Sequence, residues 1–203
     1  MTRRVVQIAS IVEGHGEVSA LPKLLYRLAA DFPTVDLRTP KPPWRRPRGS
    51  LIAANGIERE VESNSWVGSE GGILVVLDAD DDCPAELAPM LLNRARSARP
   101  DLPVSVVLAK AEYEAWFLAS AQSLAGRFGF QPDMKAPDDP EAIRDAKGWL
   151  SRHRTGGHPY KETVDQATLT SAFDITGARE RSRSFDKLCR ELEKLLIPPP
   201  DPR

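Results

Sequence analysis

Three short apolar runs alternate along the chain with segments of helical periodicity, and this alternation limits the fold more than any other feature. The runs span residues 5–12, 73–77 and 104–109. Short apolar runs bounded by turn residues are typical of strands that are buried on both faces. Strands that alternate with helices form mostly parallel sheets covered by helices. We therefore predict an α/β fold with a mostly parallel central sheet sandwiched by helices and a helical C-terminal extension.

The segments between and after these runs complete the predicted organisation. Residues 31–49 are rich in proline and arginine and lack periodicity, which predicts a long, functional or mobile excursion. We expect an α/β core over residues 1–125, a helical region packing on it over 126–197, and a disordered tail over 198–203. Apolar spacing predicts helices over these segments: 17–30, 49–64, 84–98, 112–125, 141–153, 163–173 and 184–196.

The composition is that of a globular protein of one domain, or one domain with a small appendage. The 203 residues are 41% hydrophobic with a net charge of -1, which argues against nucleic-acid binding through bulk charge. Apolar runs stay well short of the roughly 20 residues of a membrane span, and Glu13 interrupts the N-terminal stretch, so we expect neither a membrane span nor a signal peptide. Cys83 and Cys189 lie far apart, which favours a reducing, cytoplasmic location.

Acidic residues follow the first two apolar runs at the point where each strand should end. Glu13 comes directly after the first run, Glu17 lies four residues further on, and Asp78 and Asp80 follow the second run. The carboxyl ends of parallel strands share one edge of the sheet, where ligands bind. Asp78 and Asp80 are two residues apart, so in an extended strand end their carboxylates point the same way. This arrangement predicts a site for a hard divalent cation such as Mg²⁺ or Mn²⁺.

Further carboxylates extend the acidic pattern but allow a structural interpretation. Asp81 and Asp82 add charge that needs a cation or basic partner, whereas a helix cap would account for one aspartate only. Glu112 and Glu114 follow the third apolar run and add a third acidic group at the same predicted edge of the sheet. Both residues also suit the first turn of a helix. Glu17 is likewise stabilised by a helix dipole.

Several basic residues are candidates for contacts with phosphate. Arg45 and Arg46 belong to the arginine-rich excursion, and His15 lies between the two glutamates. The glycine-rich run that contains His158 ends in Lys161, but it lacks the P-loop pattern. Each of these groups also fits a solvated surface loop. If functional, Lys161 neutralises charge on the transferred phosphate and His158 is an auxiliary donor.

The order of these motifs resembles a known family. Val12–Glu17 followed by Leu77–Asp80 resembles the TOPRIM (topoisomerase-primase) pattern of a strand-end Glu and a later Asp-x-Asp. The spacing of Glu13 and Glu17 is similar to that in the overcoming-lysogenization-defect nucleases. Nearly the whole chain resembles the bacterial TOPRIM-like proteins of domain-of-unknown-function family 4276, including segments 112–118, 160–163 and 184–185. Asp81 and Asp82 depart from the pattern, since many TOPRIM sequences have a glycine after the Asp-x-Asp.

This resemblance implies Mg²⁺-dependent phosphodiester chemistry. By it, Glu13 is the general acid or base, Asp78 and Asp80 hold metal, and Glu17 is a further ligand. The expected function is a metal-dependent nuclease acting on DNA or RNA in a phage-defence or mobile-element setting. A partner ATPase, or another defence-system protein, fits that setting.

Other functions remain open from the sequence. Residues 74–80 also resemble the metal-nucleotide motif of sugar-nucleotide glycosyltransferases, although the first strand lacks the expected nucleotide loop. An aspartyl phosphatase is disfavoured because its Asp pair normally ends the first strand. The main alternative is a non-catalytic metal- or nucleotide-binding subunit of a larger complex.

Overall fold

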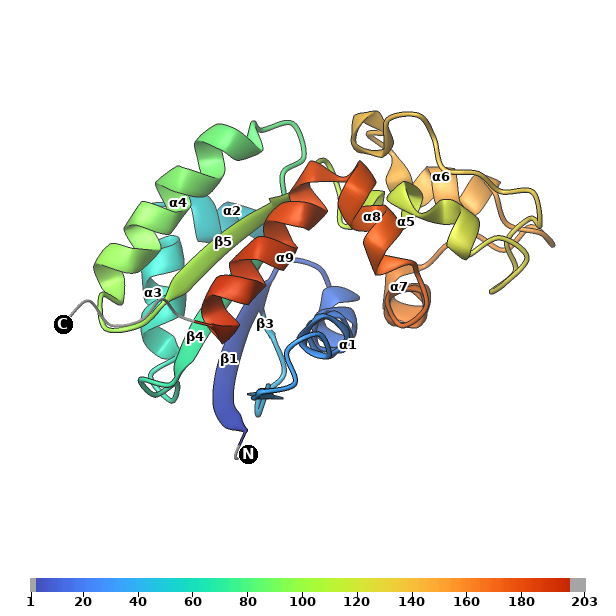
Figure 1. Cartoon of the computed structure of the whole chain (residues 1–203). Helices are drawn as coiled ribbons and strands as arrows, with labels where there is room; N and C mark the ends of the chain where they lie inside the picture. The colour runs from blue at the N-terminus through green and yellow to red at the C-terminus, as the bar shows by residue number, and fades with distance from the viewer. Residues whose placement is uncertain (1–2, 198–203) are drawn as a thin grey trace.

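The computed structural model describes residues 3–197, and within them the α/β prediction is confirmed (Figure 1). The three longest strands of the sheet are β1 (Arg4–Val12), β4 (Gly71–Asp78) and β5 (Val104–Ala109). Two short strands, β2 (Val35–Arg38) and β3 (Trp44–Arg45), pair in turn with the start and the end of β1. The order is β2-β1-β4-β5, and every pairing is parallel.

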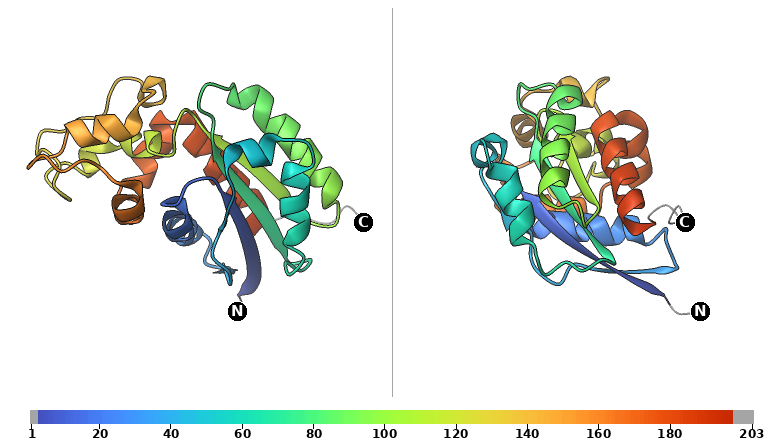
Figure 2. Two further views of the ribbon diagram at one scale, coloured as in Figure 1. Left: turned by 180° about the vertical axis from the view of Figure 1, so that it is seen from behind. Right: turned by 90° about the vertical axis from the view of Figure 1, so that its left-hand side faces the viewer.

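Alternate residues of β4 separate the two faces of the sheet. Ile73, Val75 and Leu77 belong to one hydrophobic cluster, which includes residues of α3 (Gly56–Ser63) and α4 (Pro84–Ala98). Leu74 and Val76 belong to the other cluster, with α1 (Glu17–Ala29) and α9 (Arg183–Leu196). The right-hand view of Figure 2 shows α3 and α4 on one side of the sheet and α9 on the other. The sheet is therefore sandwiched, as predicted.

A group of short helices lies beyond the carboxyl end of the sheet. These are α5 (Ala115–Ala119), α6 (Ala146–Arg152), α7 (Glu162–Thr170) and α8 (Ile175–Arg181), with 3-10 turns at Ala121–Ser123 and Pro140–Ala142. Phe117, Phe173 and Phe185 pack edge to face at centroid distances of 5.5 Å. They share one buried cluster with residues of the sheet, so the helical region packs directly on the α/β core. The domain boundary near residue 125 stays a prediction.

Several element boundaries differ from the predicted ones. The excursion over 31–49 contains β2 and β3, and α8 was not predicted. The expected helix over 49–64 is two helices, α2 (Arg48–Ile52) and α3, separated at Asn55, whose φ of 56° is left-handed. Asparagine tolerates that conformation better than most residues. The helices expected from 112 and 141 begin at 115 and 146, because residues 112–114 form a turn after β5 and residues 140–142 form a 3-10 turn before α6.

Two predictions concern the ends of the chain and membranes. The tail over 198–203 lies outside the described residues. In residues 3–197, no helix combines the length and the apolar character that a membrane crossing needs.

Candidate metal and phosphate site

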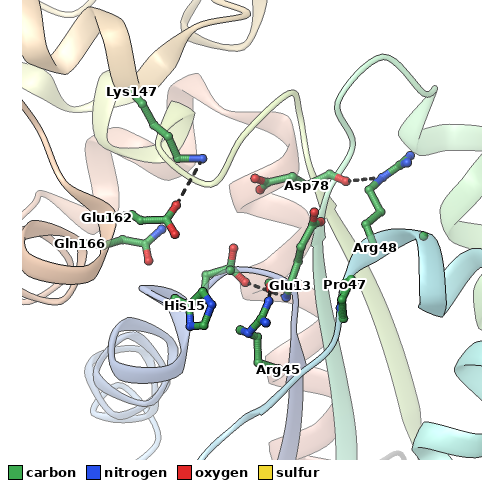
Figure 3. A pocket seen from close by; sticks show the side chains of 12 residues that line it. Glu13, His15, Arg45, Pro47, Arg48, Asp78, Lys147, Glu162 and Gln166 are labelled. Carbon is green, nitrogen blue, oxygen red and sulfur yellow. Dashed lines mark hydrogen bonds and ion pairs between the residues drawn. The ribbon is translucent and has the colours of Figure 1, made fainter.

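A cleft of about 430 Å³ opens at the carboxyl end of the sheet, between the strand ends and the helical region (Figure 3). The strand-end residues Glu13 and Asp78 face Lys147 of the helical region across it, and Glu17 lies beside Glu13. The complete lining is Glu13, Gly14, His15, Glu17, Arg45, Pro47, Arg48, Gly49, Asp78, Lys147, Glu162 and Gln166. The predicted edge of the sheet is thus the place where the acidic residues meet.

Glu17 is the most deeply buried carboxylate of the β1–α1 turn, with 2% of its surface exposed. Its Oε2 accepts a hydrogen bond from the backbone N–H of Glu13 at 3.2 Å. Burial, followed by the nearby charge of Glu114, raises the pKa of Glu17 from 4.5 to about 8. Near neutral pH the Glu17 carboxyl is therefore protonated, and a divalent cation that binds to it displaces this proton.

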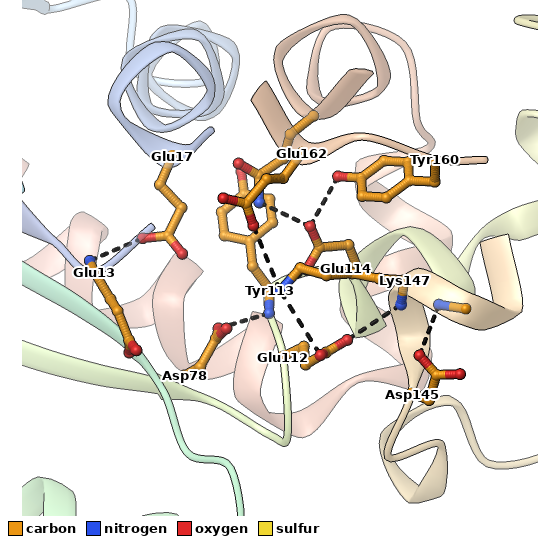
Figure 4. A network of polar contacts seen from close by, with 12 residues as sticks. Glu13, Glu17, Asp78, Glu112, Tyr113, Glu114, Asp145, Lys147, Tyr160 and Glu162 are labelled. Atoms are coloured by element: carbon orange, nitrogen blue, oxygen red, sulfur yellow. Dashed lines mark hydrogen bonds and ion pairs between the residues drawn. The ribbon is translucent and has the colours of Figure 1, made fainter. Parts of the chain in front are cut away.

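Asp78 and Glu13 lie side by side at the ends of β4 and β1 (Figure 4). Asp78 Oδ1 accepts a 2.7 Å hydrogen bond from the backbone N–H of Tyr113, which ties the β5–α5 loop to the cleft. Burial, and next the charge of Glu17, raises the pKa of Asp78. Burial also raises the pKa of Glu13, although the backbone amide of Asp78 opposes the shift. Glu13 Oε2 is buried without a hydrogen-bond partner. A cation or a hydrogen-bond donor next to this oxygen would therefore stabilise it.

Asp80 does not lie beside Asp78 as the two-residue spacing predicts. Its φ of 48° is left-handed, which breaks the strand alternation and leaves 58% of the side chain exposed. Arg48 lies 3.6 Å from its carboxylate and also donates to the backbone oxygen of Asp78. Asp80 is therefore at the rim of the cleft, where its charge still raises the pKa of Glu13.

The two remaining aspartates of this loop have basic partners. Asp82 pairs with Arg48, and Asp81 pairs with Arg144 of the helical region. These pairs supply the neutralisation that four adjacent carboxylates require. They do not add carboxylates to the cleft.

Lys147 of α6 stands among three carboxylates on the opposite wall (Figure 4). Its Nζ lies 3.7 Å from Glu112, 3.6 Å from Glu114 and 3.6 Å from Glu162. Burial lowers the pKa of Lys147, but the charges of Glu114 and its other acidic neighbours outweigh burial, and the net shift is upward. Lys147 therefore stays protonated and supplies a fixed positive charge.

The predicted basic residues separate into two groups. His15 and Arg45 line the cleft, and Arg45 donates to the backbone oxygen of Glu13. Arg46 instead pairs with Glu60 at 2.8 Å. The other group, His158 and Lys161, does not line the cleft. His158 is exposed, and exposed Lys161 is the N-cap residue of α7, where its backbone N–H donates to Asp165.

A comparison with protein families confirms the family that the order of motifs predicts. A family model described as "Domain of unknown function (DUF4276)" matches residues 12–193. The chain belongs to this family. The matched range contains every residue that lines the cleft. Comparison with curated proteins and with solved structures finds no match. Membership of the DUF4276 family does not assign an activity, and the chemistry of the cleft is what indicates one.

The helical region contributes residues to this DUF4276 cleft that were not predicted as site residues: Lys147, Glu162 and Gln166. Gln166 is 2% exposed and donates through Nε2 to Glu114 at 3.2 Å, while its Oε1 has no hydrogen-bond partner. Each lies more than thirty residues along the chain from the glutamates of the β5–α5 loop, and no short motif joins them. Gly16 is a sign of this contact in the sequence, because a Cβ at position 16 would lie 2.3 Å from Gln166 Oε1. Glycine at position 16 therefore lets α7 pack closely against the start of α1.

The donors of the cleft fit a hard cation in chemistry, but they are not gathered around one point. Within residues 3–197, no three His, Cys, Asp or Glu side chains form a group that could hold one metal ion. Glu13 Oε2 is nevertheless buried without a hydrogen-bond partner, and burial, together with neighbouring carboxylates, raises the pKa of Glu17 and Asp78. Oxygen donors of this kind are those that Mg²⁺ and Mn²⁺ prefer.

Proposed function

We propose that this protein is a metal-dependent nuclease of the TOPRIM type, which cleaves phosphodiester bonds with Mg²⁺ or Mn²⁺. The observation that carries the proposal is the convergence of Glu13, Glu17 and Asp78 in one cleft at the carboxyl end of a parallel sheet. Burial raises the pKa of each of these carboxylates, and repulsion from a nearby carboxylate adds to it: from Asp80 for Glu13, from Glu114 for Glu17 and from Glu17 for Asp78. The resemblance of segments 12–17 and 77–80 to the TOPRIM pattern supports the same chemistry.

The residues divide into roles by position. Glu17 and Asp78 would hold the cation, with Asp80 joining them from the rim. A cation bound there would polarise the scissile phosphate and lower the pKa of a bound water. Glu13 has a raised pKa and an unpartnered oxygen, so it is the carboxyl that we assign to proton transfer to or from a reacting oxygen.

The positive residues of the cleft fit a phosphate substrate. Arg45 and His15 line the wall next to Glu13, where a phosphate can accept hydrogen bonds from them. Lys147 supplies fixed positive charge on the opposite wall. Lys161 does not line the cleft, so we assign no contact with the transferred phosphate to it. DNA or RNA is the proposed substrate, and an ATPase or other phage-defence protein remains the partner proposed from the resemblance.

A direct assay tests the proposal. End-labelled single- and double-stranded DNA and RNA are incubated with the protein in Mg²⁺, Mn²⁺ or a chelator. Cleavage should need the divalent ion and should be lost in Asp78→Asn. Asp81→Asn is the matched control, because Asp81 is exposed and does not line the cleft. Cleavage that persists in Asp78→Asn refutes the assignment.

A second candidate is a non-catalytic metal- or nucleotide-binding subunit of a larger complex. One observation favours it: within residues 3–197 the carboxylates do not surround a common point, as though a partner or substrate had to complete the site. Metal binding without cleavage of any of the four nucleic acids supports this alternative over the nuclease.

A further inference from the structure

Arg48, the first residue of α2, contacts the β4–α4 loop at four points. Its Nε donates to the backbone oxygen of Asp78 at 3.1 Å, and its Nη2 donates to the backbone oxygen of Ala79 at 3.4 Å. Nη2 also pairs with the Asp82 carboxylate, and Nε lies 3.6 Å from the Asp80 carboxylate. The Arg48 side chain is 16% exposed and lines the cleft beside Asp78 (Figure 3). One guanidinium therefore holds the whole loop that follows β4.

Asp80 is the partner that Arg48 holds most weakly. The 3.6 Å between Nε and the carboxylate exceeds the roughly 2.7–2.9 Å of a charge-assisted hydrogen bond. The Asp80 side chain is also the more exposed partner of this pair, and exposed ion pairs contribute little to stability. Release of Asp80 would leave the other three contacts of Arg48 in place.

The backbone of Asp80 is fixed independently of Arg48. The N–H of Asp80 donates to the backbone oxygen of Ala111 at 3.0 Å, and the N–H of Asp82 donates to the backbone oxygen of Ala79 at 2.9 Å. A movement of the Asp80 carboxylate therefore needs a change of side-chain rotamer and no rearrangement of the loop. Such changes are fast in exposed residues.

The charges of Asp80 and Arg48 both act on the strand end of β1. Burial is the main cause of the raised pKa of Glu13, and the charge of Asp80 adds to this shift while that of Arg48 opposes it. A cation bound in the cleft would attract Asp80 and repel Arg48. It would thus compete with Arg48 for the same carboxylate.

We propose that Arg48 is a positioning residue that competes with a divalent ion for Asp80: it holds this carboxylate at the rim, and a bound ion draws the carboxylate into the cleft. The proposal rests on the metal site proposed above, formed by Glu17 and Asp78. Arg48 then sets the affinity for the ion, because the contact with Asp80 has to break before Asp80 joins the other ligands.

Calorimetric titration with Mn²⁺ tests the proposal in Arg48→Gln. The amide nitrogen of glutamine takes the position of Arg48 Nε and still donates to the backbone of Asp78, but the side chain has no charge. This variant should bind Mn²⁺ about two- to fivefold more tightly than the wild type, the range expected from the loss of an exposed ion pair. A purely structural role for Arg48 predicts weaker binding instead.

The Asp80→Asn background separates release of Asp80 from a general effect of charge. The gain from Arg48→Gln should disappear in this background. Arg45→Gln is the matched control, because Arg45 also lines the cleft and donates to a backbone oxygen, that of Glu13. Any gain from Arg45→Gln should be equal with and without Asp80. An equal gain from Arg48→Gln in both backgrounds, or no gain in the presence of Asp80, overturns the proposal.

A measurement on the wild type covers the case in which Arg48→Gln does not fold, which thermal melting detects. Addition of Mg²⁺ should shift the NMR signals of the Asp80 carboxyl carbon and the Arg48 Nε–H together with that of the Asp78 carboxyl carbon. A shift of the Asp78 signal alone overturns the proposal.

The two proposals fail in different ways. Tighter binding by Arg48→Gln that depends on Asp80, without cleavage of any nucleic acid, supports the role of Arg48 and contradicts the nuclease. Cleavage with equal Mn²⁺ affinity in the wild type and Arg48→Gln supports the nuclease and overturns the role of Arg48. Absence of ion binding in both proteins contradicts both proposals.

Discussion

The backbone N–H of Glu13 donates a 3.2 Å hydrogen bond to Oε2 of Glu17, so the first residue of the β1–α1 turn is held by the first residue of α1. The bond orients one buried carboxylate while leaving the Glu13 side chain free to face Asp78. Strand end and helix start therefore deliver two carboxylates to one cleft with a fixed relative position. The same short segment that closes the turn also builds the candidate site.

Stability should fall with pH in the absence of a divalent ion. Glu17 has a folded pKa of about 8 against an ordinary value of 4.5. Between these values the unfolded state loses the proton and the folded state keeps it, so the free energy of unfolding decreases as pH rises. The slope for one proton is at most about 1.4 kcal/mol per pH unit. Urea denaturation from pH 4.5 to 8 measures it.

Glu17→Gln should flatten this pH dependence, because the amide does not ionise. Glu62→Gln, at an exposed position of α3, is the control and should keep the wild-type slope. Mn²⁺ should also reduce the slope by favouring the ionised carboxylates. A wild-type slope that survives in Glu17→Gln contradicts the role of its burial.

Gly16→Ala should destabilise the protein by about 1–3 kcal/mol through overpacking. A Cβ at this position would lie 2.6 Å from the backbone oxygen of Glu162, and α7 cannot give way without moving its cleft residues. Gly49→Ala is the matched control, since nothing lies within 4 Å of its added Cβ. Thermal melts of the two variants make the comparison, and equal Tm values would show that the close packing of α1 on α7 is unimportant.

Glu13→Gln should reduce cleavage about 10²- to 10⁴-fold, the usual contribution of a general acid or base. The amide keeps the shape of the side chain and cannot transfer a proton. Mn²⁺ affinity should change much less than turnover, which distinguishes proton transfer from metal binding. Full turnover in Glu13→Gln removes this residue from the mechanism.

Arg45→Ala and Arg46→Ala should differ although they are neighbours in the sequence. Arg45 lines the cleft, whereas Arg46 is engaged by Glu60 and lies over the ring of Trp44. Loss of one phosphate contact should reduce the slope of log affinity against log salt by about 1 for Arg45→Ala. Filter binding at several salt concentrations, with chelator to prevent cleavage, tests this. Equal slopes for the two variants contradict the assignment.

The parts of the fold that were predictable depend on local patterns. The apolar run 104–109 and the helix 84–98 match β5 and α4 residue for residue, because continuous burial and a proline at the first turn are local signals. The boundaries of helices and strands were predicted wrongly where tertiary contacts override the local patterns. Ala111, for example, has a left-handed φ of 58° and Asp78 accepts the backbone N–H of Tyr113, so residues after β5 form a turn held by β4 and α5 starts three residues late.

The site, like the fold, was predictable only where local sequence patterns determine the position of a residue. Glu13, Glu17 and Asp78 are placed by strand ends, which the sequence marks clearly. Lys147 reaches Glu114 across 33 positions through the path of the helical region, and no short motif encodes that path. Asp80 was misplaced because its left-handed backbone turns the side chain toward Arg48, which spacing in an extended strand does not anticipate.

The central claim is that Glu17 and Asp78 hold a divalent ion, and Mn²⁺ titration by calorimetry tests it most directly. At pH 7 the wild type should bind Mn²⁺ and release protons to the buffer, since Glu17 gives up a proton when the ion binds. The double variant Glu17→Gln, Asp78→Asn should lose both the binding and the proton release. Equal binding by the double variant, or no binding by the wild type, would contradict the account.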